Sequence, residues 1–370
     1  MKHVKALGYG LAVTAALLGS AGLLWSLSTT DPESPAFAAR TEGNAGPANG
    51  PSGNDIKPPV ASGGPGHHED VPAAMRAQLA DIAEAYAVNA RFPDYSRPLQ
   101  ANDWNLLHPR AFIPRRSPVA SVPGLSASLV LDRYILDRNA DQPVKVVLAG
   151  NPGTREGVSL SAANVWLQQN GRRSAMTALA DNGQAFSGVI NAAVLRSLPP
   201  GETAVMAQLE LSNGQRTNVS AMIRLYEPQA RLVRLGESRV EGADLVIPAN
   251  FEVRSPGHYL VAANLFTADG REPVSHLNAE LALSPANPAG LLKVHAVTLR
   301  TKGTEGPYLL KDFDITRLPD APGDATGFGS TALETATVRG FPLDSYSPEP
   351  YEDPAAAEKL AFLQKMAAGK

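Results

Sequence analysis

Alternating oxygen-bearing side chains are the first chemical signal in the chain, at Asp137, Asn139 and Asp141. A calcium-binding loop begins with this spacing of carboxylate and amide oxygens. An EF-hand loop would next need a glycine and would carry a glutamate at its twelfth position, but Gln142 and Leu148 stand there. A turn between two strands uses the same residue types. We therefore predict a surface turn, with calcium binding as the alternative and no other cofactor.

A second group of potential ligands lies on a predicted strand over residues 274–283. His276, Asn278 and Glu280 alternate and so share one face of that strand, and His295 belongs to a further predicted strand. Nitrogen and oxygen ligands of this kind suit zinc or copper. The alternative is that they form the polar, solvent-facing side of a half-exposed sheet. The metal candidates are thus His276, Glu280 and His295, beside the possible calcium ligands.

The sequence carries no motif of a known catalytic class. It has no Gly-x-Ser-x-Gly elbow, no His-Glu-x-x-His helix and no phosphate-binding glycine loop before a helix. The absence of cysteine removes thiol nucleophiles and thiolate metal sites. We therefore expect that the protein is not an enzyme and has no catalytic residue.

Composition narrows the class of protein further. The 370 residues allow about two domains beyond the N-terminal leader. A formal net charge of -3 and the lack of a clustered basic face give no indication of nucleic-acid binding. The 32 glycines and 31 prolines are typical of a turn-rich β fold with disordered linkers.

The N-terminus has the pattern of an export segment. Lys2 and Lys5 precede residues 6–27, which contain no charged side chain. Twenty-two helical residues span roughly 33 Å, enough to cross the hydrocarbon core of a bilayer. An uncleaved signal-anchor would place the C-terminal bulk in the periplasm as a single-pass inner-membrane protein.

A cleaved signal peptide is the alternative. Ala36-Phe37-Ala38 before Ala39 resembles a signal-peptidase site, although it lies far from the apolar run. Cleavage after Ala38 would give a secreted or periplasmic protein. Lipoprotein processing is excluded because no cysteine can carry the lipid. Both alternatives export the rest of the chain, to the bacterial cell envelope or beyond it.

A tether and a helix follow. Residues 29–71 are rich in Gly, Pro, Ala and Ser, have few large hydrophobes, and are predicted to be disordered. A helix then begins at Pro72 and stops before Pro93. Its apolar positions recur at helical spacing, at Met75, Leu79, Ile82 and Tyr86, so we expect it to pack on the following domain.

The remainder of the chain reads mainly as antiparallel strands. Asn170-Gly171 predicts a type I′ hairpin. Alternating apolar residues over 205–211 and 219–225 flank Asn213-Gly214 and predict a second hairpin. Further strands are predicted at 274–283, 293–301 and 307–316, and a helix at 354–368 that packs back on a sandwich. Frequent turn signals without intervening helices indicate antiparallel sandwiches.

This pattern gives a mainly β fold with two tandem antiparallel immunoglobulin-like β-sandwiches, preceded by a membrane segment, a linker and a short amphipathic helix. The predicted organisation is: 1–28 signal-anchor or signal peptide; 29–71 tether; 72–122 helix plus Pro-rich extended segment; 123–228 first sandwich; 229–320 second sandwich; 321–370 loop-rich tail with a terminal helix.

Several motifs resemble those of bacterial exported proteins built from tandem immunoglobulin-like modules. They are the Pro-Gly-x-Tyr hairpin at 256–259, the Gly-Pro-Tyr-Leu-Leu segment at 306–310 and the Tyr-Ser-x-Pro-Leu segment at 95–99. The resemblance covers roughly residues 72–352. Such proteins are largely uncharacterised in function, so the resemblance implies fold and compartment and carries over no catalytic residue.

These observations predict a non-enzymatic binding or scaffolding protein of the cell envelope. Its expected partner is another envelope protein or a surface ligand, with the membrane contacted through residues 6–27 if they are uncleaved. The alternatives are an exported metal-dependent accessory enzyme, using the region of His276 and His295, and a surface adhesin.

Overall fold

The computed structural model describes residues 72–150, 158–183 and 185–369. The predicted membrane segment and tether lie outside these residues. Within them, no helix is long and apolar enough to cross a membrane. Strands make up 48% of the described residues and helices 17%, so the chain is mainly β, as the sequence predicts. The described residues belong to one compact unit with two hydrophobic cores.

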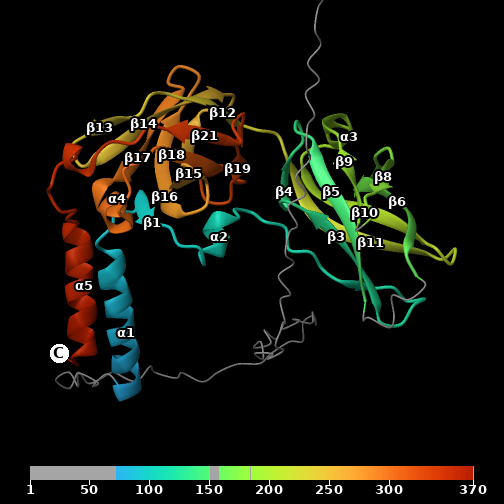
Figure 1. The fold of residues 1–370 in the computed structure, drawn as a ribbon, viewed down its shortest axis with the longest axis horizontal. Helices are drawn as coiled ribbons and strands as arrows, with labels where there is room; N and C mark the ends of the chain where they lie inside the picture. Colours follow the sequence, from blue (N-terminus) through green and yellow to red (C-terminus); the bar gives the residue numbers. More distant parts are fainter. Residues whose placement is uncertain (1–71, 151–157, 184, 370) are drawn as a thin grey trace, which may run out of the picture. The chain divides into compact units, whose positions relative to one another are not determined.

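The strands around the first core form the first module (Figure 1). Its elements are β2 (Ser117–Pro118), β3 (Leu125–Leu131), β4 (Ile135–Asp137), β5 (Gln142–Gly150), β6 (Leu160–Gln169), β7 (Arg172–Arg173), β8 (Thr177–Asp181), β9 (Phe186–Ile190), α3 (Ala192–Arg196), β10 (Gly201–Leu211) and β11 (Arg216–Tyr226). They hydrogen-bond in the order β2-β3-β5-β9-β8-β6-β10-β11-β4, with β7 beside β6. Only β4 runs parallel to its neighbour in this described sheet. Alternate side chains such as Val146, Leu167 and Val205 are fully buried in its core.

Both predicted hairpins of the first module are confirmed. Asn170 and Gly171 have φ of 47° and 78°, as a type I′ turn requires, and they join β6 to β7. In the longer hairpin β10 and β11 pair from Gly201↔Leu225 to Glu210↔Arg216. The strand-to-strand register is set by the Asn213-Gly214 turn, where Gly214 has a φ of 80°.

Two sheets enclose the second core and form the second module. Its elements are β1 (Ser96–Pro98), β12 (Ala230–Leu235), β13 (Arg239–Glu241), β14 (Asp244–Val253), β15 (Gly257–Thr267), β16 (Pro273–Leu283), β17 (Ala289–His295), α4 (Ala296–Lys302), β18 (Tyr308–Arg317), β19 (Gly327–Phe328), β20 (Ser330–Thr331), β21 (Thr335–Val338) and the 3₁₀ turn η1 (Leu343–Ser345). One sheet has the order β1-β16-β15-β18-β19 with β21 on β18. The other has the order β13-β14-β12-β20 with β17 on β14. Tyr259, Leu265 and Leu292 are fully buried between them.

The Tyr-Ser-x-Pro-Leu segment supplies an edge strand to the second module. β1 precedes the first module in sequence, yet it pairs with β16, from Ser96↔Leu277 to Pro98↔Ser275. Its proline is tolerated because an edge strand leaves one row of amide groups unpaired. Ser96 is fully buried and accepts a hydrogen bond from the His295 amide at 3.0 Å. The second module is therefore assembled from both sides of the first in the chain.

The predicted strand at 293–301 is wrong beyond residue 295, where the chain turns into α4. The side chain of His295 accepts a hydrogen bond from the Val297 amide at 3.1 Å and so caps the helix. Gly303 ends it in the left-handed conformation, with a φ of 64°. The β-branched Val297 and Thr298 favour a strand locally, but the caps at both ends favour the helix.

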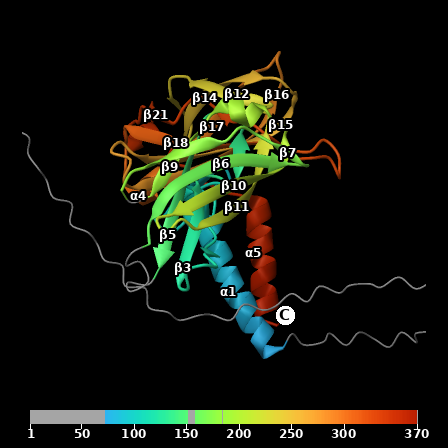
Figure 2. The ribbon, with the colours of Figure 1, turned by 90° about the vertical axis from the view of Figure 1, so that its right-hand side faces the viewer.

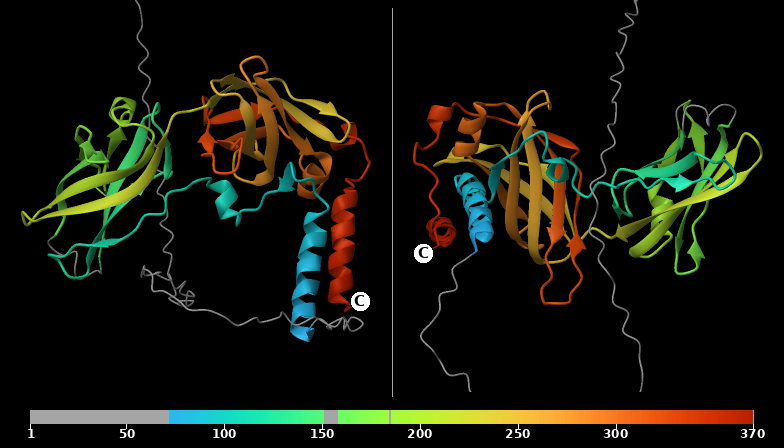
Figure 3. Two further views of the ribbon diagram at one scale, coloured as in Figure 1. Left: turned by 180° about the vertical axis from the view of Figure 1, so that it is seen from behind. Right: turned by 90° about the horizontal axis from the view of Figure 1, so that it is seen from below.

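Two longer helices pack against each other, α1 (Ala73–Asn89) and α5 (Pro354–Ala367). They lie side by side in Figure 2 and in both views of Figure 3. The Lys359 ammonium lies 5.2 Å from the centre of the Tyr86 ring. The sequence predicts that each helix packs on a sandwich, whereas in the structure each has the other helix as its main neighbour. A short helix, α2 (Trp104–Leu107), follows β1.

Candidate functional site

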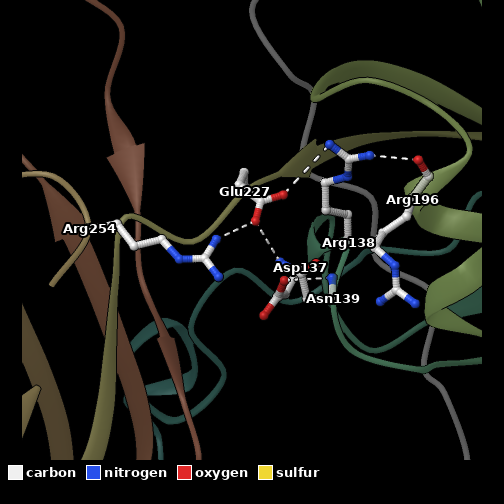
Figure 4. Close-up of polar contacts among 6 residues, drawn as sticks. All are labelled: Asp137, Arg138, Asn139, Arg196, Glu227 and Arg254. Atoms are coloured by element: carbon white, nitrogen blue, oxygen red, sulfur yellow. Dashed lines mark hydrogen bonds and ion pairs between the residues drawn. The ribbon is translucent and has the colours of Figure 1, made fainter. Parts of the chain in front are cut away.

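The ends of three strands bring charged side chains together around Glu227. Glu227 directly follows β11, and Arg254 directly follows β14. β4 pairs with the end of β11, which places Asp137 opposite Tyr226. The turn after β4 therefore lies beside Glu227 (Figure 4). We call Asp137, Arg138, Asn139, Glu227 and Arg254 the junction cluster, because Glu227 begins the link between the modules.

Glu227 is the acceptor at the centre of this cluster. Its Oε1 accepts hydrogen bonds from Asn139 Nδ2 at 3.0 Å and from Arg254 Nη1 at 2.5 Å. Its Oε2 lies 3.6 Å from Arg138 Nη1. Arg138 also donates through Nη2 to the carbonyl of Arg196 at 2.6 Å. One carboxylate thus ties the turn after β4 in the first module to Arg254 in the second.

The two carboxylates of the junction cluster have opposite electrostatic environments. Burial acts to raise the pKa of Glu227, but hydrogen bonds from Asn139 and Arg254 outweigh it and hold that pKa below its usual value. Burial raises the pKa of Asp137, although Asp137 Oδ1 accepts a hydrogen bond from the Asn139 amide at 2.8 Å. Glu227 is therefore stabilised as an anion, whereas the charge on Asp137 is disfavoured.

The hydrogen bonds around the predicted calcium ligands are those of a turn. Asp141 accepts from the Ala192 amide at 2.8 Å, at the start of α3, while Asn139 donates to Glu227. The three side chains Asp137, Asn139 and Asp141 thus have three separate partners. Among the described residues, no three His, Asp or Glu side chains are placed to hold a metal ion together.

A hollow of about 200 Å³ lies next to the junction cluster. Its charged lining combines Asp137 and Glu252 with Arg231 and Arg254. Carboxylates and guanidinium groups are equal in number, so the hollow has no strong preference for an anion or a cation. Its arrangement fits a contact between modules better than a site for a small charged ligand.

A second set of contacts joins the two modules, and the sequence does not predict it. Tyr226 donates to the Gly329 carbonyl at 2.9 Å and its ring lies 5.4 Å from that of Phe328. Arg110, in the Pro-rich segment, pairs with Asp314 of β18 at 2.6 Å. Its guanidinium also lies 4.5 Å above the Phe328 ring. More than 200 residues of chain separate Arg110 from Asp314, so no local pattern indicates this pairing.

His276 takes part in a hydrogen-bond network on the β16-β15-β18 sheet. Its Nδ1 lies 2.8 Å from Asn264 Oδ1. Asn264 is almost fully buried and donates to the Leu106 carbonyl at 2.7 Å and to Asp312 Oδ2 at 3.2 Å. Burial lowers the pKa of His276. This network attaches α2 to the sheet.

Glu280 and His295 do not join His276. Glu280 lies 3.7 Å from His258, and both side chains are exposed. His295 caps α4, and its ring lies between those of Tyr95 and Tyr351, at 6.5 Å and 5.6 Å. Burial lowers the pKa of His295. The structure therefore does not bring the predicted ligands His276, Glu280 and His295 together.

Known proteins show only weak similarity to this chain. No protein-family model and no curated protein sequence matches the chain. A DUF4785 family protein from Legionella pneumophila shares 12% identity at a TM-score of 0.35, over 52% of this chain and 53% of that one. This chain thus spans about half the length of that structure.

Two adhesin structures are also similar in part. A bacterial ice-binding adhesin of 1.5 MDa shares 12% identity at a TM-score of 0.20, over 58% of this chain and 64% of that one. A tetra-tandem repeat from the extending region of a large adhesion protein shares 12% identity at a TM-score of 0.22, over 57% and 48%. TM-scores this low establish neither a shared fold nor a shared function.

Proposed function

We propose that this chain is a non-enzymatic binding or scaffolding protein of the bacterial cell envelope. In this proposal its two modules are immunoglobulin-like β-sandwiches held outside the cytoplasmic membrane. They present their loops and strand edges to another envelope protein or a surface ligand. The proposal rests on the hydrogen-bond partners of the polar side chains that the sequence marks as candidate ligands.

The observation that carries the proposal is that these candidate ligands are hydrogen-bonded within the protein. Asp141 accepts from the first turn of α3, His295 caps α4, and His276 bonds the buried Asn264. Asp137 and Asn139 bond within the junction cluster. Each of these groups thus has a partner that stabilises the fold, as expected of a protein that acts through its surface.

The immunoglobulin-like assignment of the second module is supported by two tyrosine corners. Tyr259 near the start of β15 donates to the carbonyl of Ser255 at 2.5 Å, four residues upstream. Tyr308 at the start of β18 donates to the carbonyl of Thr304 at 2.9 Å, again four residues upstream. A buried tyrosine that bonds back to the preceding backbone is a hallmark of immunoglobulin-like sandwiches.

The scaffolding role is supported by the contacts that join the modules. Hydrogen bonds and ion pairs from Glu227, Tyr226 and Arg110 all cross from one module to the other or to its linker. A pair of modules connected at several points keeps its binding surfaces at a defined spacing, unlike modules on a flexible linker.

The test compares binding with metal-dependent catalysis. Purified full chain should contain far less than one equivalent of zinc, copper or calcium by plasma mass spectrometry. His276→Ala should leave that content unchanged, and Glu272→Ala, at an exposed position that is not a candidate ligand, serves as the control. One equivalent of metal that is lost in His276→Ala would overturn the proposal in favour of the accessory enzyme.

Two further measurements test the compartment. Sequencing the N-terminus of the mature protein from fractionated cells should find the chain uncleaved and in the membrane fraction if residues 6–27 are an anchor. A mature protein that begins at Ala39 would exclude the anchor. Protease digestion of intact cells distinguishes an adhesin, which would be degraded, from a periplasmic scaffold, which would not.

A further inference from the structure

We propose that β11 is an interaction surface at which two copies of this chain pair, strand to strand, in an antiparallel β-ladder. β11 pairs with β10 along one side over Arg216–Leu225. On the other side β4 covers only Arg224–Tyr226. Residues 216–222 therefore form an open edge. This inference is independent of the partner named in the proposed function.

The hydrogen-bonding groups at this edge can be assigned from the groups around it. Peptide groups alternate in direction along a strand, and the Arg224 amide points away from β10 to bond the Tyr134 carbonyl at 2.8 Å. The N–H and C=O groups of Arg216, Asn218, Ser220 and Met222 point the same way. None of these backbone groups has a partner among the described residues. Such a row is a template for another strand.

The edge lacks the features that usually prevent pairing. Residues 216–222 contain no proline and one charged residue, Arg216, and their pairing with β10 shows no bulge. In the second module, by contrast, β1 covers part of the edge of β16. The side chain of Met222 is 61% exposed on the outer face, although it is large and apolar.

A second copy of β11 fits this edge in one register. With a two-fold axis at Val219, Arg216 lies opposite Met222 of the other copy and Asn218 lies opposite Ser220. All four open residues of each strand are then hydrogen-bonded, and no like charges face each other. The aliphatic part of Arg216 covers the exposed Met222 of the other copy. A shift of two residues places Arg216 opposite Arg224 or shortens the ladder.

Disulfide cross-linking tests this register directly, because the natural chain has no cysteine. In the full chain, the double variant Asn218→Cys/Ser220→Cys places the cysteine at position 218 of one copy opposite the cysteine at position 220 of the other copy. Mild oxidation in intact membranes should give a covalent dimer. The control is Met206→Cys/Gln208→Cys, the β10 residues paired with Ser220 and Asn218. These two cysteines have the same two-residue spacing but lie on β10, which β11 separates from the open edge, so the control variant should give no covalent dimer.

A charged side chain at position 222, opposite Arg216 of the other copy, gives a second test. Met222→Arg would face Arg216 twice in the symmetric dimer and should weaken dimerisation about tenfold, whereas Met222→Glu should preserve or strengthen it. Light scattering of the full chain in detergent measures both. Circular dichroism shows whether each variant is folded.

Backbone substitution completes the test. Ser220→Pro removes one outward N–H that β10 does not use, so the module should fold, but the dimer should be lost. Ser220→Ala should leave the dimer intact. A full chain that stays monomeric at all concentrations, or a dimer unaffected by both Ser220→Pro and Met222→Arg, would overturn the proposal. Cross-links to a different protein alone would do so as well.

Discussion

The guanidinium of Arg110 and the carboxylate of Asp314 form an ion pair of 2.6 Å that fastens the Pro-rich segment to β18. Their side chains are only 11% and 24% exposed. Arg110 donates in addition to Thr316 Oγ1 at 2.5 Å and lies above the Phe328 ring. The contact therefore combines a shielded ion pair with a cation–π interaction, and it connects segments from both sides of the first module.

Replacement of Arg110 should destabilise the protein markedly. Arg110→Ala leaves Asp314 without its cation in a partly buried place, and we expect a loss of about 2 kcal/mol in the free energy of unfolding. Urea unfolding of the full chain in detergent measures it. Arg97→Ala is the matched control, because Arg97 pairs with Asp94 where both side chains are exposed, and it should cost less than about 0.5 kcal/mol. Equal losses in both variants would contradict the role of Arg110.

The contribution of Glu227 should depend on pH. Its pKa in the folded chain lies below its usual value of 4.5. The ionised form is thus favoured by folding, so its contribution is complete above pH 4.5 and is lost as the pH falls through the folded pKa. Glu227→Gln should be less stable than the natural chain at neutral pH, and the difference should shrink in acid. Unfolding curves at both pH values check this, and a difference that grows in acid would contradict it.

Asp137 should respond in the opposite direction. Burial raises its pKa above 3.8, so ionisation opposes folding, and the stabilising effect of its neutral form is lost as the pH rises through the folded pKa. Asp137→Asn keeps the side chain neutral and retains an oxygen for the Asn139 amide. We expect it to be at least as stable as the natural chain at neutral pH, with no gain in acid. A clear loss at neutral pH would instead indicate that the Asp137 charge is needed.

The tyrosine corners should each contribute measurably. Tyr259→Phe and Tyr308→Phe each remove one hydroxyl and leave a part-buried hydrogen bond to the Ser255 or Thr304 carbonyl unmade, so each should cost about 1–2 kcal/mol. Calorimetric melting compares them with Tyr134→Phe, whose side chain is 47% exposed and should have little effect. Corner variants that melt like the control would remove this support for an immunoglobulin-like sandwich.

The sequence predicts the parts of the fold that follow from local rules. The Asn213-Gly214 turn and the alternation around it suffice to predict the β10–β11 hairpin with its register. The alternation of His276, Asn278 and Glu280 likewise matches their places in β16, opposite Asn264, Ala262 and Leu260. These features depend on neighbouring residues, so they are readable without the tertiary structure.

The contacts between distant segments could not be predicted in this way. β1 has three residues and lies among prolines, so its strand pattern is too short to detect. The partners of Glu227 come from turns that meet only when β4 pairs with β11. The sequence does not indicate that His276 bonds Asn264 or that the His295 ring accepts a hydrogen bond from the Val297 amide. In each case tertiary structure, rather than local pattern, decides the partner.

Photocross-linking in cells that express the chain tests the central claim of a binding protein most directly. A photoreactive amino acid would replace exposed residues of the two modules, such as Lys145 and Glu252, with the buried Leu265 as control. We predict a discrete covalent adduct with another envelope component at some exposed positions and none at Leu265. If every exposed position gave only the uncross-linked chain or adducts with a second copy, the binding function would be contradicted.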